Sequence, residues 1–245
     1  MLVLDAEILS AAGLDDPDAI LTKPIGTVVK AAVPGHEVRH IDGVGAAGLF
    51  IKRVHGADVR EVSNEWRILS HLARHGIPAP LPVALVERRK AAGIVTRGIP
   101  VAATLEERLV RERGPGDAQD LLRRLALLVR DLHDAGVNHR DLYIGHILID
   151  SDACLWLVDL GRAEKRRRVP RYRIIKDLAA LDFSTPARIA GDAARLRFLR
   201  RYAGKAIQKR RLRALARAVR RKSLRMRRHA ERKIARGDTN IHVNT

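Results

Sequence analysis

Residues 138–162 read NHRDLYIGHILIDSDACLWLVDLGR, and the interpretation of the whole chain starts from this stretch. Apolar runs at 147–149 and 155–158 flank a polar turn at 150–152, and this pattern predicts a β-hairpin. Asp141 precedes the hairpin and Asp159 follows it. Because a hairpin returns the chain to where it began, we expect both carboxylates at its open end.

Two such carboxylates suit phosphoryl transfer, in which one orients the attacking hydroxyl and one binds Mg²⁺. The reaction also needs a cation for the nucleotide phosphates, and Lys52 on a predicted strand at Leu49–Val54 is the candidate. In the helix predicted for 57–75, Glu65 lies near the apolar face. We expect it to pair with Lys52, because an unpaired charge beside a core is costly. The alternative is two ordinary surface charges.

The first hundred residues show β-strand patterns. The predicted strands are Thr27–Val33, Glu37–Ile41, Leu49–Val54, Leu81–Glu87 and Gly93–Thr96. Residues 43–48, GVGAAG, match the pattern GxGxxG, but β-prone residues follow them, so they are interpreted as a hairpin turn. Gly35 is the better candidate for a loop over phosphates, and Gly98 with Pro100 marks a hinge between two lobes.

Helical patterns dominate after the hinge. A helix capped by Asp117 carries a leucine stripe and ends at Gly136. Further helices are predicted at Ile174–Phe183, Ala187–Tyr202 and Lys205–Arg236.

Composition favours a cytoplasmic protein. The chain has 245 residues, 46% of them apolar, and a single cysteine, Cys154, so no internal disulfide can form. No apolar run approaches the roughly 18 to 20 residues that cross a bilayer, and the N-terminus lacks the pattern of a secretory signal.

The net charge of +19 is concentrated near the C-terminus. Residues 195–236 hold 19 Lys or Arg and one acid, which leaves 28 basic and 27 acidic residues elsewhere, from totals of 47 and 28. Such a block favours binding to a polyanion: nucleic acid, an anionic membrane surface or a phosphorylated glycolipid. The alternative is a solvated basic helix that aids solubility.

Four short segments, in this order along the chain, resemble the protein-kinase-like superfamily. They are FIKR with Lys52, then Glu65, HRDL at 139–142, and DLG at 159–161. The patterns HRDLYIGHILI, LVDLGR and RIIKDLAALDFS are similar to the bacterial lipopolysaccharide core kinases, the heptose and Kdo kinases. The resemblance covers about residues 25–185. Protein kinases have asparagine where this chain has His146, and the lipopolysaccharide kinases have histidine there.

The resemblance implies ATP and Mg²⁺ as cofactors. ATP would meet Lys52 oriented by Glu65, and the backbone of Arg97, Gly98 and Ile99 would meet adenine.

On the acceptor side, the resemblance makes Asp141 the catalytic base and Asp159 a ligand of Mg²⁺. His146 is implied as a second metal ligand or a hydrogen-bonding group, and a buried core histidine is the alternative. Asp177 resembles the residue that braces the catalytic loop.

The expected fold class is α+β, a bilobal protein-kinase-like fold. An N-lobe at 1–98 holds an antiparallel sheet with one helix, a mainly helical C-lobe occupies 99–203, and a basic helical tail occupies 204–245.

The expected function is ATP-dependent phosphorylation of a heptose or Kdo of the lipopolysaccharide inner core, with this glycolipid as partner. An atypical serine/threonine protein kinase of the RIO or Bud32 kind is the alternative. The short step from Asp159 to Asp177 leaves no obvious peptide platform, which argues against an ordinary serine/threonine protein kinase. The RIO and Bud32 kinases usually have HGDL, or HxD followed by asparagine, which fits this chain less well than HRDLY with His146. The basic tail suggests a peripheral site on the inner face of the cell membrane. Nucleic-acid binding on an inactive kinase scaffold is disfavoured by the intact Lys52, Asp141 and Asp159. The sequence makes no prediction of oligomeric state.

Overall fold

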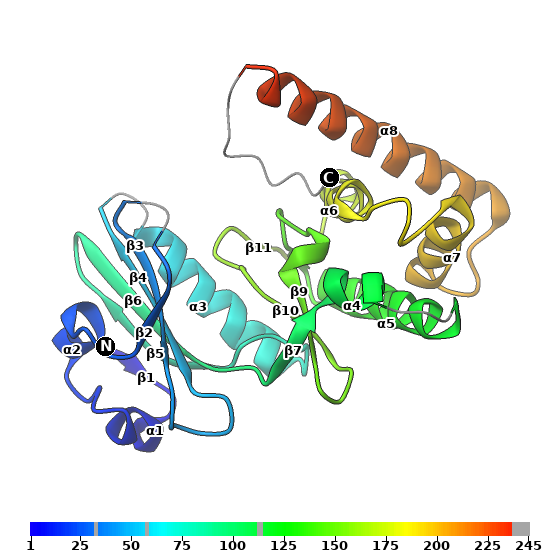
Figure 1. Cartoon of the computed structure of the whole chain (residues 1–245). Coiled ribbons are helices and arrows are strands. Elements are labelled where there is room, and N and C mark those ends of the chain that lie inside the picture. Colours follow the sequence, from blue (N-terminus) through cyan, green and yellow to red (C-terminus); the bar gives the residue numbers. More distant parts are fainter. Residues whose placement is uncertain (32–33, 57–58, 112–114, 237–245) are drawn as a thin grey trace. The chain divides into compact units, whose positions relative to one another are not determined.

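The computed structural model describes residues 1–31, 34–56, 59–111 and 115–236 (Figure 1). The chain forms two compact units, which are described separately. The first comprises residues 1–101 and 156–163, and the second comprises 102–155 and the chain from Glu164 onward.

The first unit is built on a six-stranded antiparallel sheet in the order β1–β5–β6–β4–β3–β2. The strands are β1 (Leu2–Val3), β2 (Thr27–Lys30), β3 (His36–Ile41), β4 (Leu49–His55), β5 (Pro82–Glu87) and β6 (Ala91–Arg97). The predicted meander of β2, β3 and β4 is confirmed, and residues 43–48 form the turn between β3 and β4. Positions 32 and 33 of the first predicted strand lie outside the described residues.

Three helices pack on this sheet (Figure 1): α1 (Ala6–Ala11), α2 (Pro17–Thr22) and α3 (Val59–Arg74). Helix α3 was predicted for 57–75, of which 57 and 58 lie outside the described residues. Helices α1 and α2 were not predicted, because six residues are too few for a helical period to stand out. Their local signals are caps: the Asp5 and Asp16 carboxylates accept from Ile8 and Asp18 N–H groups.

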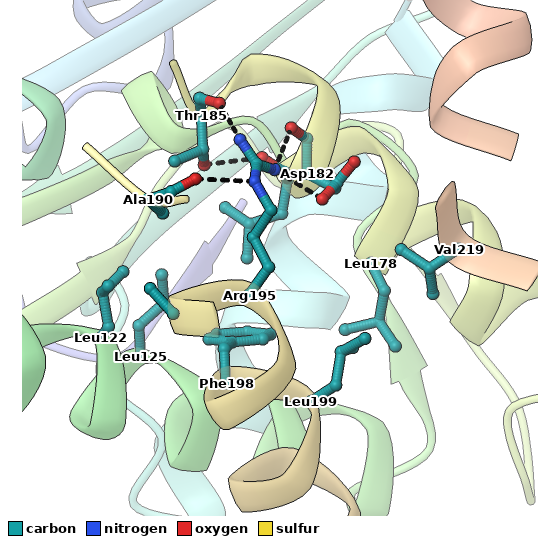
Figure 2. Close-up of a pocket in the computed structure, with 12 residues that line it drawn as sticks. Leu122, Leu125, Leu178, Asp182, Thr185, Ala190, Arg195, Phe198, Leu199 and Val219 are labelled. Atoms are coloured by element: carbon teal, nitrogen blue, oxygen red, sulfur yellow. Dashed lines mark hydrogen bonds and ion pairs between the residues drawn. The ribbon is translucent and has the colours of Figure 1, made fainter. Parts of the chain in front are cut away.

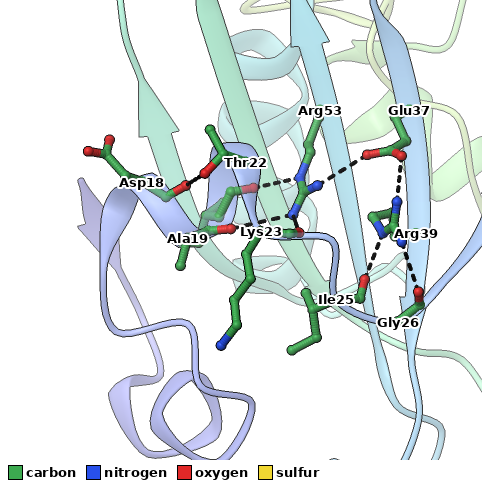
Figure 3. Close-up of polar contacts among 10 residues, drawn as sticks. Asp18, Ala19, Thr22, Lys23, Ile25, Gly26, Glu37, Arg39 and Arg53 are labelled. Atoms are coloured by element: carbon green, nitrogen blue, oxygen red, sulfur yellow. Dashed lines mark hydrogen bonds and ion pairs between the residues drawn. The ribbon is translucent and has the colours of Figure 1, made fainter.

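Arg53, buried on β4, fastens helix α2 to the sheet (Figure 3). Its Nε donates to the Ile20 carbonyl at 2.7 Å, and one terminal nitrogen donates to the Lys23 carbonyl at 2.6 Å. These carbonyls lie at the C-terminal end of α2, where a cation satisfies otherwise unpaired backbone oxygens. The other terminal nitrogen pairs with Glu37 on β3 at 3.1 Å. The first 25 residues are therefore an integral part of this unit.

The second unit is mainly helical. Its helices are α4 (Leu105–Arg111), α5 (Pro115–Asp134), α6 (Arg171–Ser184), α7 (Asp192–Ala203) and α8 (Lys209–Ile234). A three-stranded sheet has the order β10–β9–β7, although Val101 of β7 and Trp156 and Leu157 of β10 count with the first unit. A two-stranded sheet pairs β11 with β8. These strands are β7 (Val101–Thr104), β8 (Val137–Asn138), β9 (Ile147–Asp150), β10 (Leu155–Leu157) and β11 (Glu164–Lys165). The hairpin predicted around residues 150–152 is confirmed as β9 and β10.

Two predictions about helix starts are wrong. Helix α5 begins at Pro115, a residue favoured at a first helical position, so position 117 lies inside the helix and not before it. Helix α7 begins at Asp192 and not at Ala187, since residues 185–191 form the connection from α6.

Arg195 of α7 fixes this connection (Figure 2). Its guanidinium donates to the carbonyls of Asp182, Thr185 and Ala190 at 2.8, 2.6 and 2.7 Å. Beside it lies a small apolar pocket between α5, α6, α7 and α8. Its lining includes Leu122, Leu125, Leu178, Phe198, Leu199 and Val219. Helix α8 packs on α6 and buries Leu212, Val219 and Ala230, so it belongs to the body of this unit.

Candidate active site

The predicted ion pair between strand β4 and helix α3 is present. Lys52 Nζ lies 2.7 Å from Glu65 Oε2, and both side chains are largely buried. Burial acts to lower the pKa of Lys52, but the carboxylates of Glu65, Asp159 and Glu61 outweigh it and hold that pKa above its ordinary value. Lys52 is therefore a fixed cation at neutral pH, which suits a group that contacts phosphates.

Asp159 and Gly161 lie in the same unit as this ion pair. Asp159 has a φ of +61°, a left-handed conformation that is uncommon for any residue except glycine. A Cβ at Gly161 would lie 3.2 Å from Lys52 Nζ and 3.4 Å from Glu65 Oε2. The glycine therefore leaves room for the ion pair beside the DLG segment.

Asn64 of α3 holds that segment in place. Its amide nitrogen donates to the Gly161 carbonyl at 2.9 Å and to the Ala163 carbonyl at 2.8 Å. Asn64 thus positions the chain after Asp159, and the next residue of α3, Glu65, positions Lys52. No sequence pattern points to Asn64, because a single asparagine on a helix belongs to no motif or period.

The segment at 97–99 packs against the turn at 43–48. Gly98 N–H donates to the Gly48 carbonyl at 2.8 Å, and a Cβ at Gly98 would lie only 1.9 Å from the Ala47 carbonyl oxygen. Only glycine fits there. Arg97 N–H donates to the Leu81 carbonyl at 2.8 Å, and its side chain pairs with Asp5.

The predicted catalytic loop, residues 139–146 in the second unit, is braced by Asp177. This carboxylate is fully buried on α6 and accepts from the N–H groups of His139 at 2.7 Å and Arg140 at 2.9 Å. The predicted brace is therefore confirmed. It holds Arg140 at a φ of +75°, directly before Asp141.

Two further residues extend the brace. His133 Nε2 lies 3.3 Å from the Asp177 carboxylate, and His133 Nδ1 lies 2.8 Å from the Tyr202 hydroxyl. A carboxylate only accepts, so Nε2 carries the proton and Nδ1 accepts from Tyr202. Burial, followed by Asp134 and Asp177, raises the pKa of Tyr202, which keeps the hydroxyl protonated. Sequence patterns did not point to His133, which resembles an ordinary helix residue before the loop.

His146 follows Asp141 within the same loop. Its Nδ1 lies 2.9 Å from the Asp141 carbonyl oxygen, which can only accept, so Nδ1 is the donor in this hydrogen bond. Its ring also stacks on His139 and meets Tyr143 edge-on. The imidazole thus shapes the loop, and in its neutral form Nε2 can act as a metal ligand or hydrogen-bond acceptor.

The donor set fits Mg²⁺ of the kind bound with a nucleotide. Within the described ranges, no group of three His, Cys, Asp or Glu side chains could hold a metal ion alone. Mg²⁺ in such sites needs only one or two carboxylates, since phosphates and water supply the remaining oxygens. Asp159 beside the fixed charge of Lys52 meets this requirement.

The geometry groups the predicted residues as follows. Lys52, Glu65 and Asp159 come together in the first unit, which also contains Arg97, Gly98 and Ile99. Asp141 and His146 share the loop at 139–146 in the second unit, and Asp177 braces its start.

The chain has a protein-kinase-like fold. A solved aminoglycoside-3′-phosphotransferase of type VIII is similar to 87% of this chain and 98% of its own, with a TM-score of 0.57 and 19% identity. At that identity the likeness shows the fold alone, and it confirms the predicted fold class.

The family to which the chain belongs is shown by its amino-acid sequence. Residues 45–202 match the Lipopolysaccharide kinase (Kdo/WaaP) family. Because this match covers more than half of the 245 residues, the chain belongs to that family, as its sequence patterns predicted. It is accordingly a phosphotransferase with an alcohol group as acceptor.

Curated relatives carry two names. The lipopolysaccharide core heptose(I) kinase WaaP of Escherichia coli is 27% identical over 210 residues, 67% of this chain and 79% of the relative. The enzyme of that name from Pseudomonas aeruginosa is 36% identical over 154 residues, 56% of this chain and 58% of the relative. The 3-deoxy-D-manno-octulosonic acid kinase of Vibrio cholerae is 31% identical over 102 residues, 40% of this chain and 42% of the relative.

Among the described residues, no helix is long and apolar enough to cross a membrane.

Proposed function

We propose that this protein transfers the γ-phosphate of ATP to a hydroxyl of a heptose or Kdo in the lipopolysaccharide inner core. The observation that carries the proposal is the Lys52–Glu65 pair beside Asp159, in a chain of the lipopolysaccharide kinase family. Phosphoryl transfer depends chiefly on positioning and on charge stabilisation, and a fixed, buried cation supplies both.

The nucleotide would bind to the predicted N-lobe, residues 1–98, and to the segment that follows it. Lys52 would hold the α and β phosphates, and Glu65 would keep its ammonium in place. The N–H groups of Arg97 and Gly98 already donate to the protein. Adenine would therefore meet the carbonyls of the segment at 97–99 and the N–H of Ile99.

The acceptor would bind to the predicted C-lobe, residues 99–203. Its hydroxyl oxygen attacks the γ-phosphorus, a new O–P bond forms, the bond to the β-phosphate oxygen breaks, and ADP leaves. Asp141 would orient the hydroxyl and take its proton.

Asp159 would hold Mg²⁺, with His146 Nε2 as a second ligand or as an acceptor for a water molecule. When bound, Mg²⁺ neutralises charge on the phosphates. Imidazole is a softer ligand than Mg²⁺ prefers, so Asp159 is the main protein ligand in this proposal.

The experiment is to incubate the protein with Mg-ATP and a panel of inner-core acceptors and to weigh the products. Addition of one phosphate to a heptose or Kdo is expected. Asp141→Ala should lower turnover by roughly 10²–10⁴-fold, the contribution of a general base, and leave ATP binding nearly intact. No phosphate on any core sugar, together with efficient phosphorylation of a protein, would favour the protein-kinase alternative.

The basic tail, residues 204–245, is proposed to hold the protein on the inner, cytoplasmic face of the cell membrane. Exposed arginines recur at helical spacing along the solvent face of α8, namely Arg210, Arg217, Arg221 and Arg228. Within the described part of the chain, no acid pairs with any of the four.

Where α7 meets α8, the same surface contains an open groove of about 680 Å³. It is lined by Leu196, Lys209, Arg210, Arg213, Ala216 and Arg217. Four cations around one groove suit the phosphates of anionic lipid, at about 1 kcal/mol per basic residue near the surface.

Vesicle binding tests the tail without cutting α8. Changing Arg210, Arg217, Arg221 and Arg228 to Gln should weaken binding to anionic vesicles by about 1 kcal/mol per charge. The matched control changes exposed residues Arg60, Arg89, Lys90 and Arg111 to Gln. Unchanged vesicle binding in the α8 variant, with lost binding to nucleic acid, would favour the nucleic-acid alternative.

A further inference from the structure

The chain segment after the DLG motif is tied to the catalytic loop by backbone pairing. Strand β11 pairs antiparallel with β8, with Glu164 opposite Asn138 and Lys165 opposite Val137. Arg166 N–H donates to the Gly136 carbonyl at 2.8 Å, and a Cβ at Gly136 would lie 2.1 Å from the Arg166 carbonyl oxygen. Residues 164–166 are therefore held by backbone hydrogen bonds in a fixed register against residues 136–138, directly before the loop.

Glu164 in this segment is surrounded by three arginines. Its carboxylate lies 3.1 Å from Arg140, 2.9 Å from Arg166 and 3.5 Å from Arg173. One carboxylate thus receives three guanidinium groups, from the loop, from its own segment and from helix α6. Burial acts to raise the pKa of Glu164, but these arginines hold it below its ordinary value, so the carboxylate is ionised at neutral pH.

Arg140 is the residue directly before Asp141, and it is held at both ends. Its N–H is fixed by Asp177 at 2.9 Å, and its guanidinium is fixed by Glu164. Its Nε is buried and has no hydrogen-bond partner among the described residues. Glu164 is the one carboxylate in the described ranges that pairs with the Arg140 side chain. Since Arg140 has a left-handed backbone, its conformation depends on such outside contacts.

We propose that Glu164 is a positioning residue: a built-in anion that holds Arg140, and through it the Asp141 backbone, in the conformation used for transfer. A phosphate placed among three arginines would make the same charge-assisted contacts. In this protein the Glu164 carboxylate supplies that negative charge, so the loop at 139–146 is ordered without phosphorylation of the segment after the DLG motif. The consequence for turnover rests on the proposed function.

The kinetic test compares Glu164→Gln and Glu164→Ala with the wild type. Both should lose between about ten-fold and a hundred-fold in kcat, the scale of a small misplacement near the chemistry. KM for ATP should be nearly unchanged, because the proposed nucleotide ligands lie in the other unit. Inorganic sulfate should restore part of the kcat of Glu164→Ala by filling the space among the arginines. The control is Glu87→Ala, an exposed glutamate at the end of β5.

Hydrogen exchange of residues 137–146 provides a readout that does not need the acceptor. Exchange there should be faster in Glu164→Ala than in wild type and should slow again with sulfate. Wild-type kcat in Glu164→Gln overturns the proposal even if Glu164→Ala fails to fold. A loss of kcat or of protection that sulfate leaves unchanged in a folded Glu164→Ala also overturns it. If the wild type phosphorylates no core sugar, the proposed function fails, and the exchange experiment still decides the role of Glu164.

Discussion

The side chains at 52 and 65 form an ion pair whose strength depends on pH. The pKa of Lys52 is raised in the folded protein, so its contribution to stability is fully present below the pKa of an unfolded lysine, about 10.4. That contribution is lost as the pH rises through the higher folded value.

Lys52→Met should therefore destabilise the protein at pH 7 by roughly 1.5–3 kcal/mol, the range for a hydrogen bond to a charged group. The difference in free energy of unfolding from wild type should shrink above pH of about 10.4. Denaturant unfolding across this range measures it, with exposed Lys90→Met as control. A difference that stays constant into alkaline pH would show that the ammonium charge is not the source.

His146 donates a hydrogen bond to the Asp141 carbonyl and, in our proposal, offers Nε2 to Mg²⁺ or to water. Two substitutions can separate these roles. An asparagine amide can donate to the Asp141 carbonyl as Nδ1 does and offers an oxygen that Mg²⁺ accepts more readily. His146→Asn should hold kcat within about ten-fold, whereas His146→Ala should lose about a hundred-fold through loop misplacement. Titration of activity against Mg²⁺ is the measurement. Equal losses in both variants would mean that the imidazole itself is required.

At the scale of elements, the DLG turn and helix α3 depend on close contact at one glycine. Gly161→Ala would place a methyl group 3.2 Å from Lys52 Nζ, so the flexible lysine tip must move away from Glu65. Turnover should fall by roughly ten-fold to a hundred-fold, with little change in the melting temperature.

Gly191→Ala is the control for this glycine, because a Cβ there meets nothing within 4 Å. Unchanged turnover in Gly161→Ala would show that the ion pair tolerates displacement.

Much of the site was predictable from the order of its parts. Lys52 and Asp159 stand in short motifs, which identify them without knowledge of the fold. Glu65 is identified by its place near the apolar face of a predicted helix. Asn64 binds backbone carbonyls, His133 binds a carboxylate and a hydroxyl, and Glu164 binds arginines. Only the tertiary structure brings these partners near. No local period marks such residues.

Secondary-structure elements were likewise predictable only where the sequence itself carries the signal. Long strands and helices with a clear period were predicted, whereas α1, α2 and α4 have six or seven residues each and show none. Their stability comes from caps and from burial against the sheet or the other helices.

At the scale of the molecule, helix α8 combines an exposed cationic face with buried apolar residues. Truncation after Tyr202 should abolish cooperative unfolding of the second unit, because Leu212, Val219 and Ala230 lose their buried sites. Burial of one such large side chain is worth about 1.5–3 kcal/mol, against a total stability of about 5–15 kcal/mol.

Circular dichroism during heating is the measurement for the truncation, and the Gln variant of the four α8 arginines is the control. A truncated chain that melts like the wild type would mean that α8 is an independent appendage.

Strand β4 carries two neighbouring cations, Lys52 and Arg53, whose side chains lie on opposite faces of the sheet and bind different partners. The Lys52 side chain contacts Glu65 of α3 and, in our proposal, the phosphates. The Arg53 side chain contacts the C-terminal end of α2 (Figure 3). Successive side chains of a strand point to opposite faces. Deleting one residue between positions 48 and 52 would move the arginine to position 52, facing Glu65, and the lysine to the buried position of Ile51. The carbonyls at residues 19–23 would lose the arginine that binds them. Insertions and deletions in this short stretch should therefore be tolerated far less than substitutions at its surface positions, since a single change of frame removes the phosphate ligand and the anchor of the first 25 residues together.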